Sequence, residues 1–135
     1  MLRKPRKIFL LLAAVFYSIA GILHFLRPAM YMKIIPPYVP WHLAMVYLSG
    51  AAEILGGIGL LIPRVRRGAA LGLVALLVAV FPANIYMATN PIEAGAGSLP
   101  PAALWGRLLL QPILIWWVLW ATKPVLTRVS PRATV

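Results

Sequence analysis

The hydrophobic positions of the chain fall into four long runs. They cover residues 8–26, 43–62, 68–88 and 102–121. A helix needs about 20 apolar residues to cross a hydrocarbon core of about 30 Å, and each run is close to that length. Lipid offers no hydrogen-bond partners to the backbone, so such runs must form helices. The pattern predicts an all-α, polytopic membrane protein, with one domain over residues 1–135 and four transmembrane helices in a bundle.

Composition agrees with insertion into a bilayer. Apolar residues make up 62% of the chain and charged residues only 11%. In a typical soluble domain, about a quarter of all residues are charged. The net charge is +11 because thirteen Lys and Arg face only two acids, Glu53 and Glu93. We therefore expect the lipid bilayer as a partner and no nucleic acid. The absence of cysteine excludes disulfides, thiolate metal sites and thiol nucleophiles.

Basic residues next to the apolar runs predict the orientation. Ten lie in the two terminal tails and in the turn between the second and third runs, and two lie in the loop after the first run. The ten are Arg3, Lys4, Arg6, Lys7, Arg64, Arg66, Arg67, Lys123, Arg128 and Arg132, and the two are Arg27 and Lys33. Because short basic loops stay in the cytoplasm, both termini are predicted to be cytoplasmic.

The start of the chain also has features of a cleavable signal peptide, namely a basic tail, an apolar run and small residues at Ser18 and Ala20. The run continues without a break to Phe25, which is longer than a usual signal-peptide core. We therefore expect the first helix to be retained.

The loop after the first run is rich in proline and predicts a short surface helix. Pro28 precedes residues 29–35, which are apolar except for Lys33, and Pro36 and Pro37 follow. Proline suits the first turn of a helix and disfavours helix before it. We expect this helix to lie at the outer membrane surface. Aromatic belts are predicted at Trp41 and Trp105 on the outer side and Trp120 on the inner side.

Several polar residues lie within the apolar runs, and seven of them are candidates for a site. Ionisable groups at membrane depth cost a few kcal/mol each, so they indicate a functional site by default. Helical spacing places several of them in pairs on common faces, and all four helices contribute a polar group to the outer half. We therefore predict a polar cavity in the outer half of the bundle. The candidate binding residues are Tyr17, His24, Ser49, Glu53, Asn84, Arg107 and Gln111.

Other interpretations of these polar residues remain open. Glu53 and Arg107 could form a buried ion pair that holds two helices together, with His24 and Asn84 as hydrogen-bonded neighbours. A metal site is disfavoured because His24 and Glu53 supply only two good ligands. Haem is disfavoured because two axial His ligands would need a matched depth, whereas His42 lies in the outer interface beside the His24 end of the bundle rather than deep in the core. No metal is predicted.

Small residues and prolines predict how the helices pack. Glycine allows close helix approach, and the positions predicted to do so are Gly56, Gly57 and Gly59 in the second helix and Gly68 and Gly72 in the third. Pro82 is expected to kink the third helix just before Asn84, and Pro112 to kink the fourth beside Gln111.

An ordered set of motifs spans about Phe16 to Met87. It consists of His24-Phe25, Pro28, Tyr31, Pro36-Pro37, Pro40, Ser49-Gly50, Glu53, Gly56-Gly57, Pro63, Arg67 and Pro82-Ala83-Asn84. This set resembles the DoxX-like family of small four-helix membrane proteins, and the likeness fades in the fourth helix. The resemblance implies a four-span bundle in a bacterial cytoplasmic (inner) membrane, with His24, Glu53 and Asn84 lining its polar cavity. Some relatives are subunits of quinone-reducing thiosulfate oxidation or partners in membrane redox assemblies, whereas this chain has no cysteine for a thiol relay.

Three functions follow as hypotheses. The first is an accessory or small-molecule-binding membrane protein whose cavity takes a quinone, hydrogen-bonded by His24, Glu53 and Arg107, with electrons supplied by a membrane redox partner subunit. The second is a cofactor-free enzyme acting on a lipid-like substrate, with Glu53 or His24 as acid and base. The third is a structural assembly partner or homo-oligomer without a ligand. The sequence shows no evident cofactor site, and quinone enters by analogy alone.

Overall fold

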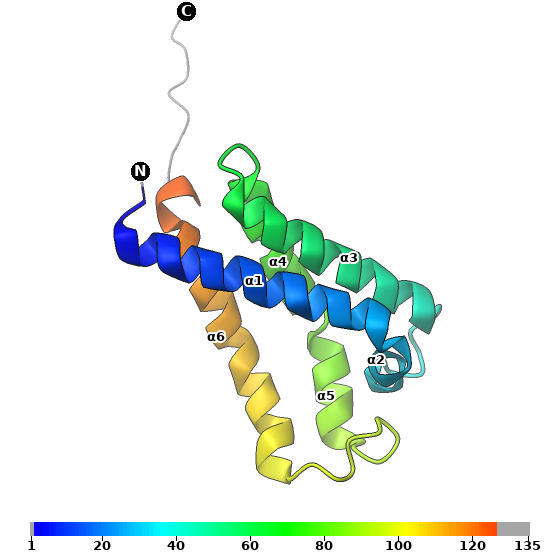
Figure 1. Cartoon of the computed structure of the whole chain (residues 1–135). Helices are drawn as coiled ribbons and strands as arrows, with labels where there is room; N and C mark the ends of the chain where they lie inside the picture. The colour runs from blue at the N-terminus through cyan, green and yellow to red at the C-terminus, as the bar shows by residue number, and fades with distance from the viewer. Residues whose placement is uncertain (1, 127–135) are drawn as a thin grey trace, which may run out of the picture.

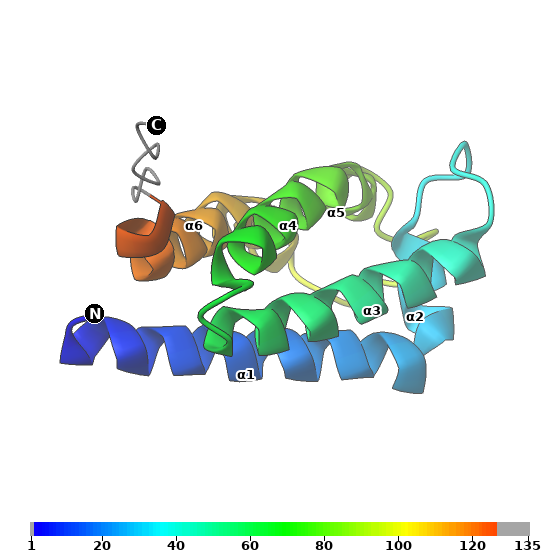
Figure 2. The same cartoon turned by 90° about the horizontal axis from the view of Figure 1, so that it is seen from above.

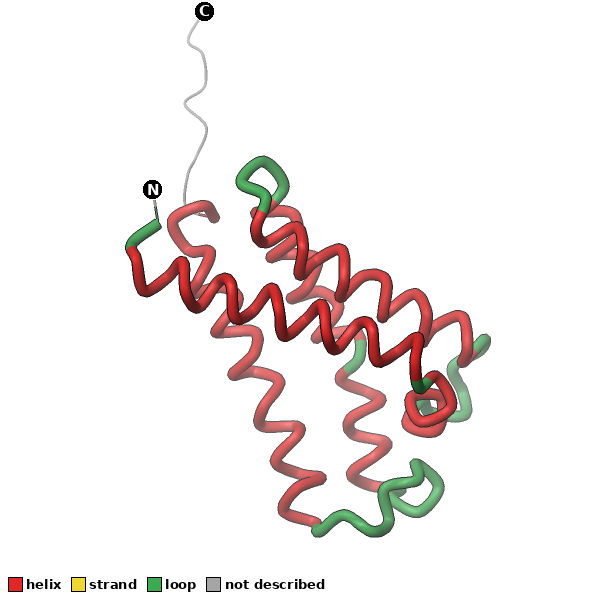
Figure 3. Tube along the Cα trace, in the orientation of Figure 1, coloured by secondary structure: helices red, strands yellow, loops and turns green. Residues whose placement is uncertain are grey.

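The computed structural model describes residues 2–126, and the secondary structure in this part of the chain is helical (Figure 3). The helices are α1 (Lys4–Leu26), α2 (Pro28–Ile34), α3 (His42–Leu61), α4 (Arg66–Ala79), α5 (Phe81–Thr89) and α6 (Pro101–Leu126). Four segments are long and apolar enough to cross a membrane, namely α1, α3, α4 together with α5, and α6. The prediction of an all-helical protein with four candidate spans is confirmed.

The helices form two layers that cross at an angle. Helices α1 and α3 lie side by side in one layer, and α4, α5 and α6 form the other (Figures 1 and 2). The α1–α3 contact is the closest because glycines line it. A Cβ atom on Gly21 would lie 2.5 Å from the carbonyl oxygen of Gly50, and one on Gly57 would lie 2.8 Å from that of Ala14. These two backbones therefore pack with no room for a side chain.

The contact between the layers relies on the glycines of α3. A Cβ atom on Gly56 would lie 2.5 Å from the side chain of Leu73, and one on Gly59 would lie 2.7 Å from that of Ala69. The predictions for Gly56, Gly57 and Gly59 are thus confirmed. Those for Gly68 and Gly72 are wrong, because both face open space with no atom within 4 Å. Helix α4 instead offers larger side chains, which fill the space that the α3 glycines leave.

The third span is not one continuous helix. Helix α4 ends at Ala79, and α5 begins at Phe81 with Pro82 in its first turn. Proline has no N–H and its ring clashes with the preceding turn, so a break at this point follows from the sequence. The predicted kink before Asn84 is confirmed. By contrast, α6 remains helical through Pro112.

Helices α1 and α6 touch at one end and separate at the other (Figure 1). The rings of Phe9 and Trp120 meet edge to face at 5.5 Å, and those of Phe16 and Trp117 lie 6.0 Å apart. The Trp117 indole N–H also donates to the Phe9 carbonyl oxygen at 3.2 Å. Beyond Phe16, α1 runs alongside α3, whereas α6 turns away toward α5.

Helix α2 lies at the end where the layers separate. It begins at Pro28 and ends at Ile34, before Pro36, as the prolines predict. The loops following α2 and α5 lie at this end, whereas the start of α1 and the α3–α4 turn with Arg64 lie at the other (Figure 1). Arg128 and Arg132, which contributed to the predicted orientation, lie outside the described residues.

Two apolar clusters hold the two ends together. The larger joins α1, α3, α4 and α6 around Tyr17, Leu60, Leu73 and Val118. The smaller joins α5, its following loop and α6 around Met87, Ala94 and Leu104. The space between them is where the polar residues gather.

Candidate functional site

A cavity of about 270 Å³ lies between the two apolar clusters, with lining residues from every described helix. Seven of these are the polar residues singled out from the sequence: Tyr17, His24, Ser49, Glu53, Asn84, Arg107 and Gln111. The remaining lining is mostly apolar. The structure therefore brings all seven together, and their role in binding stays a prediction.

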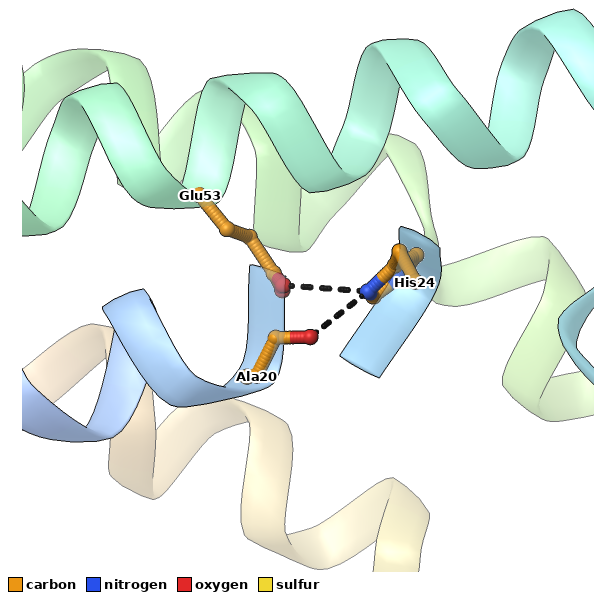
Figure 4. A network of polar contacts seen from close by, with 3 residues as sticks. All are labelled: Ala20, His24 and Glu53. Atoms are coloured by element: carbon orange, nitrogen blue, oxygen red, sulfur yellow. Dashed lines mark hydrogen bonds and ion pairs between the residues drawn. The ribbon is translucent and has the colours of Figure 1, made fainter. Parts of the chain in front are cut away.

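Glu53 on α3 and His24 on α1 face each other in the cavity (Figure 4). His24 Nδ1 lies 3.4 Å from Glu53 Oε2 and 2.8 Å from the Ala20 carbonyl oxygen. A carbonyl oxygen only accepts hydrogen bonds, so His24 carries a proton on Nδ1 and donates it to Ala20. The shorter distance shows that this proton is directed chiefly at Ala20, which leaves Glu53 with an electrostatic contact.

Close helix packing fixes the place of His24. A Cβ atom on Gly50 would lie 2.7 Å from the Cβ of His24, so only glycine lets α3 approach α1 at this level. On its other side, the imidazole stacks on the Tyr31 ring with centroids 3.8 Å apart. Helix α2 thus closes the cavity over His24.

Tyr31 is a lining residue that the list of candidate residues omitted. Its signal in the sequence is weak, because it is one aromatic residue in a short surface helix, although it is one of the residues on which the expected resemblance to DoxX-like proteins rests. Burial raises the pKa of the Tyr31 phenol, with the Glu53 charge adding to the rise and Arg107 opposing it. The phenol therefore stays neutral at physiological pH and can donate a hydrogen bond.

Arg107 does not pair with Glu53. Among the described residues, the ion pair of Glu53 is with His24, and Arg107 has none. The proposed structural pair between Glu53 and Arg107 is therefore wrong. Arg107 fails to reach Glu53 because α6 diverges from α1 and α3 at this level, so its side chain lies exposed at the edge of the cavity.

The cavity opens at the side of the bundle. Its exposed lining residues are Phe16 on α1, and Arg107 and Leu110 on α6. These are the two helices that lie close together at the start of α1 and separate toward the other end (Figure 1). The opening therefore lies between two candidate membrane spans.

Three buried polar atoms in the cavity lack a hydrogen-bond partner. They are the Tyr17 hydroxyl, Glu53 Oε2 and Gln111 Oε1. Tyr17 is 1% exposed and Gln111 is 4% exposed, so bulk water does not reach them freely. An unsatisfied buried group costs about 1–3 kcal/mol. Such atoms in a native protein call for an occupant, either water or a ligand.

The Gln111 side chain bridges the two halves of the second layer. Its Nε2 donates to the Leu77 carbonyl oxygen at 3.1 Å, and Leu77 is near the end of α4. Because a carbonyl oxygen only accepts hydrogen bonds, the Gln111 atom in contact with Leu77 must be the amide nitrogen. The other terminal atom of the side chain is therefore the amide oxygen, Oε1. The backbone partner could not be found from sequence, because a carbonyl oxygen has no sequence signature.

Metal chemistry finds no support in the part of the chain that the structure describes. No group of three or more His, Cys, Asp or Glu side chains is placed to hold a metal ion there. His42 is not among the residues that line the cavity with His24.

Comparison with known protein families gives one match. The model of a domain of unknown function, DUF8561, matches residues 12–122. The chain belongs to this family. The match spans all four candidate membrane segments in whole or in part, so the cavity lies within the family domain. No curated protein and no solved structure matches the chain.

Proposed function

We propose that this DUF8561 protein binds a small amphipathic molecule in the membrane, with the head group in the cavity and an apolar tail in the bilayer. A quinone-type ring is the head group of choice, with His24, Glu53 and Arg107 among its partners. The protein then acts as an accessory component of a bacterial cytoplasmic membrane. The similarity to DoxX-like proteins supports this choice by analogy.

The observation that carries the proposal is the combination of a polar cluster with a sideways opening. Pockets that enclose a drug-sized ligand measure about 300–1,000 Å³. The volume here, about 270 Å³, suits one substituted ring better than a ring with a long tail. The tail must therefore leave through the opening.

The side chains at the opening are apolar enough to contact an apolar tail. Phe16 and Leu110 are exposed at 41% and 46%, and they flank the cavity on helices apolar enough to cross the membrane. In a bilayer these side chains face acyl chains. A ligand dissolved in the membrane can thus reach the cavity without crossing water.

The orientation belongs to the same proposal. Arg64, Arg66 and Arg67 lie at the end of the bundle that holds the start of α1, and the rule that basic loops stay inside puts this end in the cytoplasm. The cavity then lies in the outer half, beneath α2.

A redox role requires a partner. The chain has no cysteine, so a thiol relay to a bound quinone has to come from another subunit. We therefore place the protein beside a membrane redox subunit, as a binding component rather than the source of electrons.

A second candidate function is a cofactor-free enzyme. The contact between His24 and Glu53, 3.4 Å apart in a largely apolar cavity, favours it because one group can remove a proton from a lipid-like substrate and the other can return it. Lipid extracts from cells with wild-type protein and with Glu53→Gln would then differ in one species.

Ligand-induced stabilisation tests the binding proposal. Detergent-purified protein is heated with a decyl-substituted benzoquinone and, separately, with the corresponding hydroquinone. We expect at least one of them to raise the melting temperature in a saturable way, because a ligand that binds the folded state stabilises it. Tyr17→Phe should weaken binding about 2- to 12-fold, the loss of one hydrogen bond of about 0.5–1.5 kcal/mol.

The matched control is Tyr47→Phe. Tyr47 stacks on Phe25 at 5.2 Å and does not line the cavity, so its hydroxyl should not affect binding. The proposal would be contradicted if neither ligand stabilised the protein, or if Tyr17→Phe and Tyr47→Phe lost the same amount of binding affinity. A structural assembly partner without a ligand would then be the better explanation.

A further inference from the structure

The three unpartnered atoms of the cavity restrict the chemistry of its occupant. Gln111 Oε1 is a carbonyl oxygen and only accepts hydrogen bonds, and its own Nε2 is already committed to Leu77. Glu53 Oε2 also lacks a donor, because the Nδ1–H of His24 is directed at Ala20. The occupant must therefore donate a hydrogen bond to Gln111 Oε1, and a second one to Glu53 Oε2 when this carboxylate is ionised.

The same cavity also contains groups that donate. The Tyr17 hydroxyl has no partner, and, among the described residues, neither the Asn84 amide nor the Arg107 guanidinium has a hydrogen-bond acceptor. Both line the cavity. These donors favour an occupant that accepts hydrogen bonds as well as donating them.

Few head groups meet both requirements. A carbonyl accepts and cannot donate, so a quinone would leave Gln111 Oε1 unsatisfied. An ammonium group donates and cannot accept, so it would leave the donors of Asn84 and Arg107 without an acceptor. A hydroxyl group does both.

We propose that the cavity selects a ring bearing hydroxyl groups, the reduced or hydroquinone form, over the corresponding quinone, with hydroxyl hydrogens donated to Gln111 and Glu53. This inference rests on the proposed function, because it assumes that an amphipathic ring binds at all. It implies that the protein binds the hydroquinone more tightly than the quinone of the same redox pair.

The experiment compares four decyl-tailed ligands on the full-length protein in detergent. They are decylhydroquinone, decylbenzoquinone, decylhydroquinone dimethyl ether and decyltrimethylammonium. The dimethyl ether keeps the ring and its acceptors but has no hydroxyl hydrogen, and it does not undergo the redox reaction. Dissociation constants are measured by calorimetry under anaerobic conditions. We expect decylhydroquinone to bind at least tenfold more tightly than each of the others.

Variants locate the preference. Gln111→Met removes the accepting oxygen. It should bring the ratio of the dissociation constants of decylhydroquinone and its dimethyl ether closer to one, without weakening the binding of the dimethyl ether. Asn90→Leu is the matched control, because the Asn90 amide also donates to a helix carbonyl, that of Tyr86, but does not line the cavity. This control should keep the wild-type ratio. If Gln111→Met does not fold, the wild-type ratios alone decide.

The outcomes separate the two proposals. Quinone or dimethyl ether binding as tightly as hydroquinone overturns the inference and leaves the binding function standing. Tightest binding of decyltrimethylammonium overturns it in favour of a cation site. No binding by any of the four overturns both, and water is then the occupant of the cavity.

Discussion

Single glycines determine where the polar groups of the cavity stand. Gly21 and Gly50 face each other across α1 and α3, and each leaves no space for a methyl group without moving backbone or the His24 side chain. His24 comes within reach of Glu53 because the two helices approach this closely. The same residue type at Gly72 faces open space, so glycine alone does not identify a contact.

The variants Gly21→Ala and Gly72→Ala form a matched test at this scale. Gly21→Ala should lower the free energy of unfolding by about 1–3 kcal/mol, the usual cost of overpacking. Gly72→Ala should change it by less than about 1 kcal/mol, and in the stabilising direction, because alanine favours helix. Thermal unfolding in the same detergent measures both. Equal effects would contradict the close α1–α3 contact.

At the scale of elements, the turn between α3 and α4 is held by one of its three arginines. The Arg66 guanidinium donates to the carbonyl oxygens of Leu60 and Leu61, at 2.6 and 3.2 Å. These carbonyls lie at the C-terminus of α3, where a positive charge also complements the helix dipole. Sequence marked Arg64, Arg66 and Arg67 alike as a basic turn, and only the fold distinguishes them.

Replacing Arg66 and Arg64 separately tests this difference, because each replacement removes one positive charge from the same turn. Arg66→Met should lower the free energy of unfolding by about 1–2 kcal/mol, because two helix-end carbonyls lose a charged donor. Arg64→Met should have little effect, since Arg64 is exposed and makes no hydrogen bond within the described part of the chain. Chemical denaturation of the two proteins in micelles gives the comparison, and the reverse order would refute the cap.

For the whole molecule, the proposed orientation follows from where the charges lie relative to the bundle. The loops after α2 and α5 share the end opposite the start of α1 (Figure 1). These loops, residues 35–41 and 90–100, contain no Lys or Arg. Short loops with many basic residues stay in the cytoplasm. We therefore propose that the opposite end, which holds the basic turn, is the cytoplasmic one.

Cysteine labelling tests the orientation cleanly because the chain has no cysteine of its own. Tyr38→Cys and Ser98→Cys, both at exposed positions, should react with an impermeant maleimide on intact cells. Arg64→Cys should react only after permeabilisation. Labelling of Arg64→Cys alone on intact cells would invert the topology and place the cavity on the cytoplasmic side.

The sequence by itself determined the spans, the break at Pro82, the short helix α2 and the set of polar residues. These are local properties, because each follows from hydrophobic length, proline chemistry or the position of a side chain on one helix. The tertiary structure decided that Glu53 meets His24 instead of Arg107, and that Gly68 and Gly72 face open space. It also decided which three oxygens lack partners. These features depend on the angle between two layers of helices, which arises from contacts between residues far apart in the chain and has no local signal.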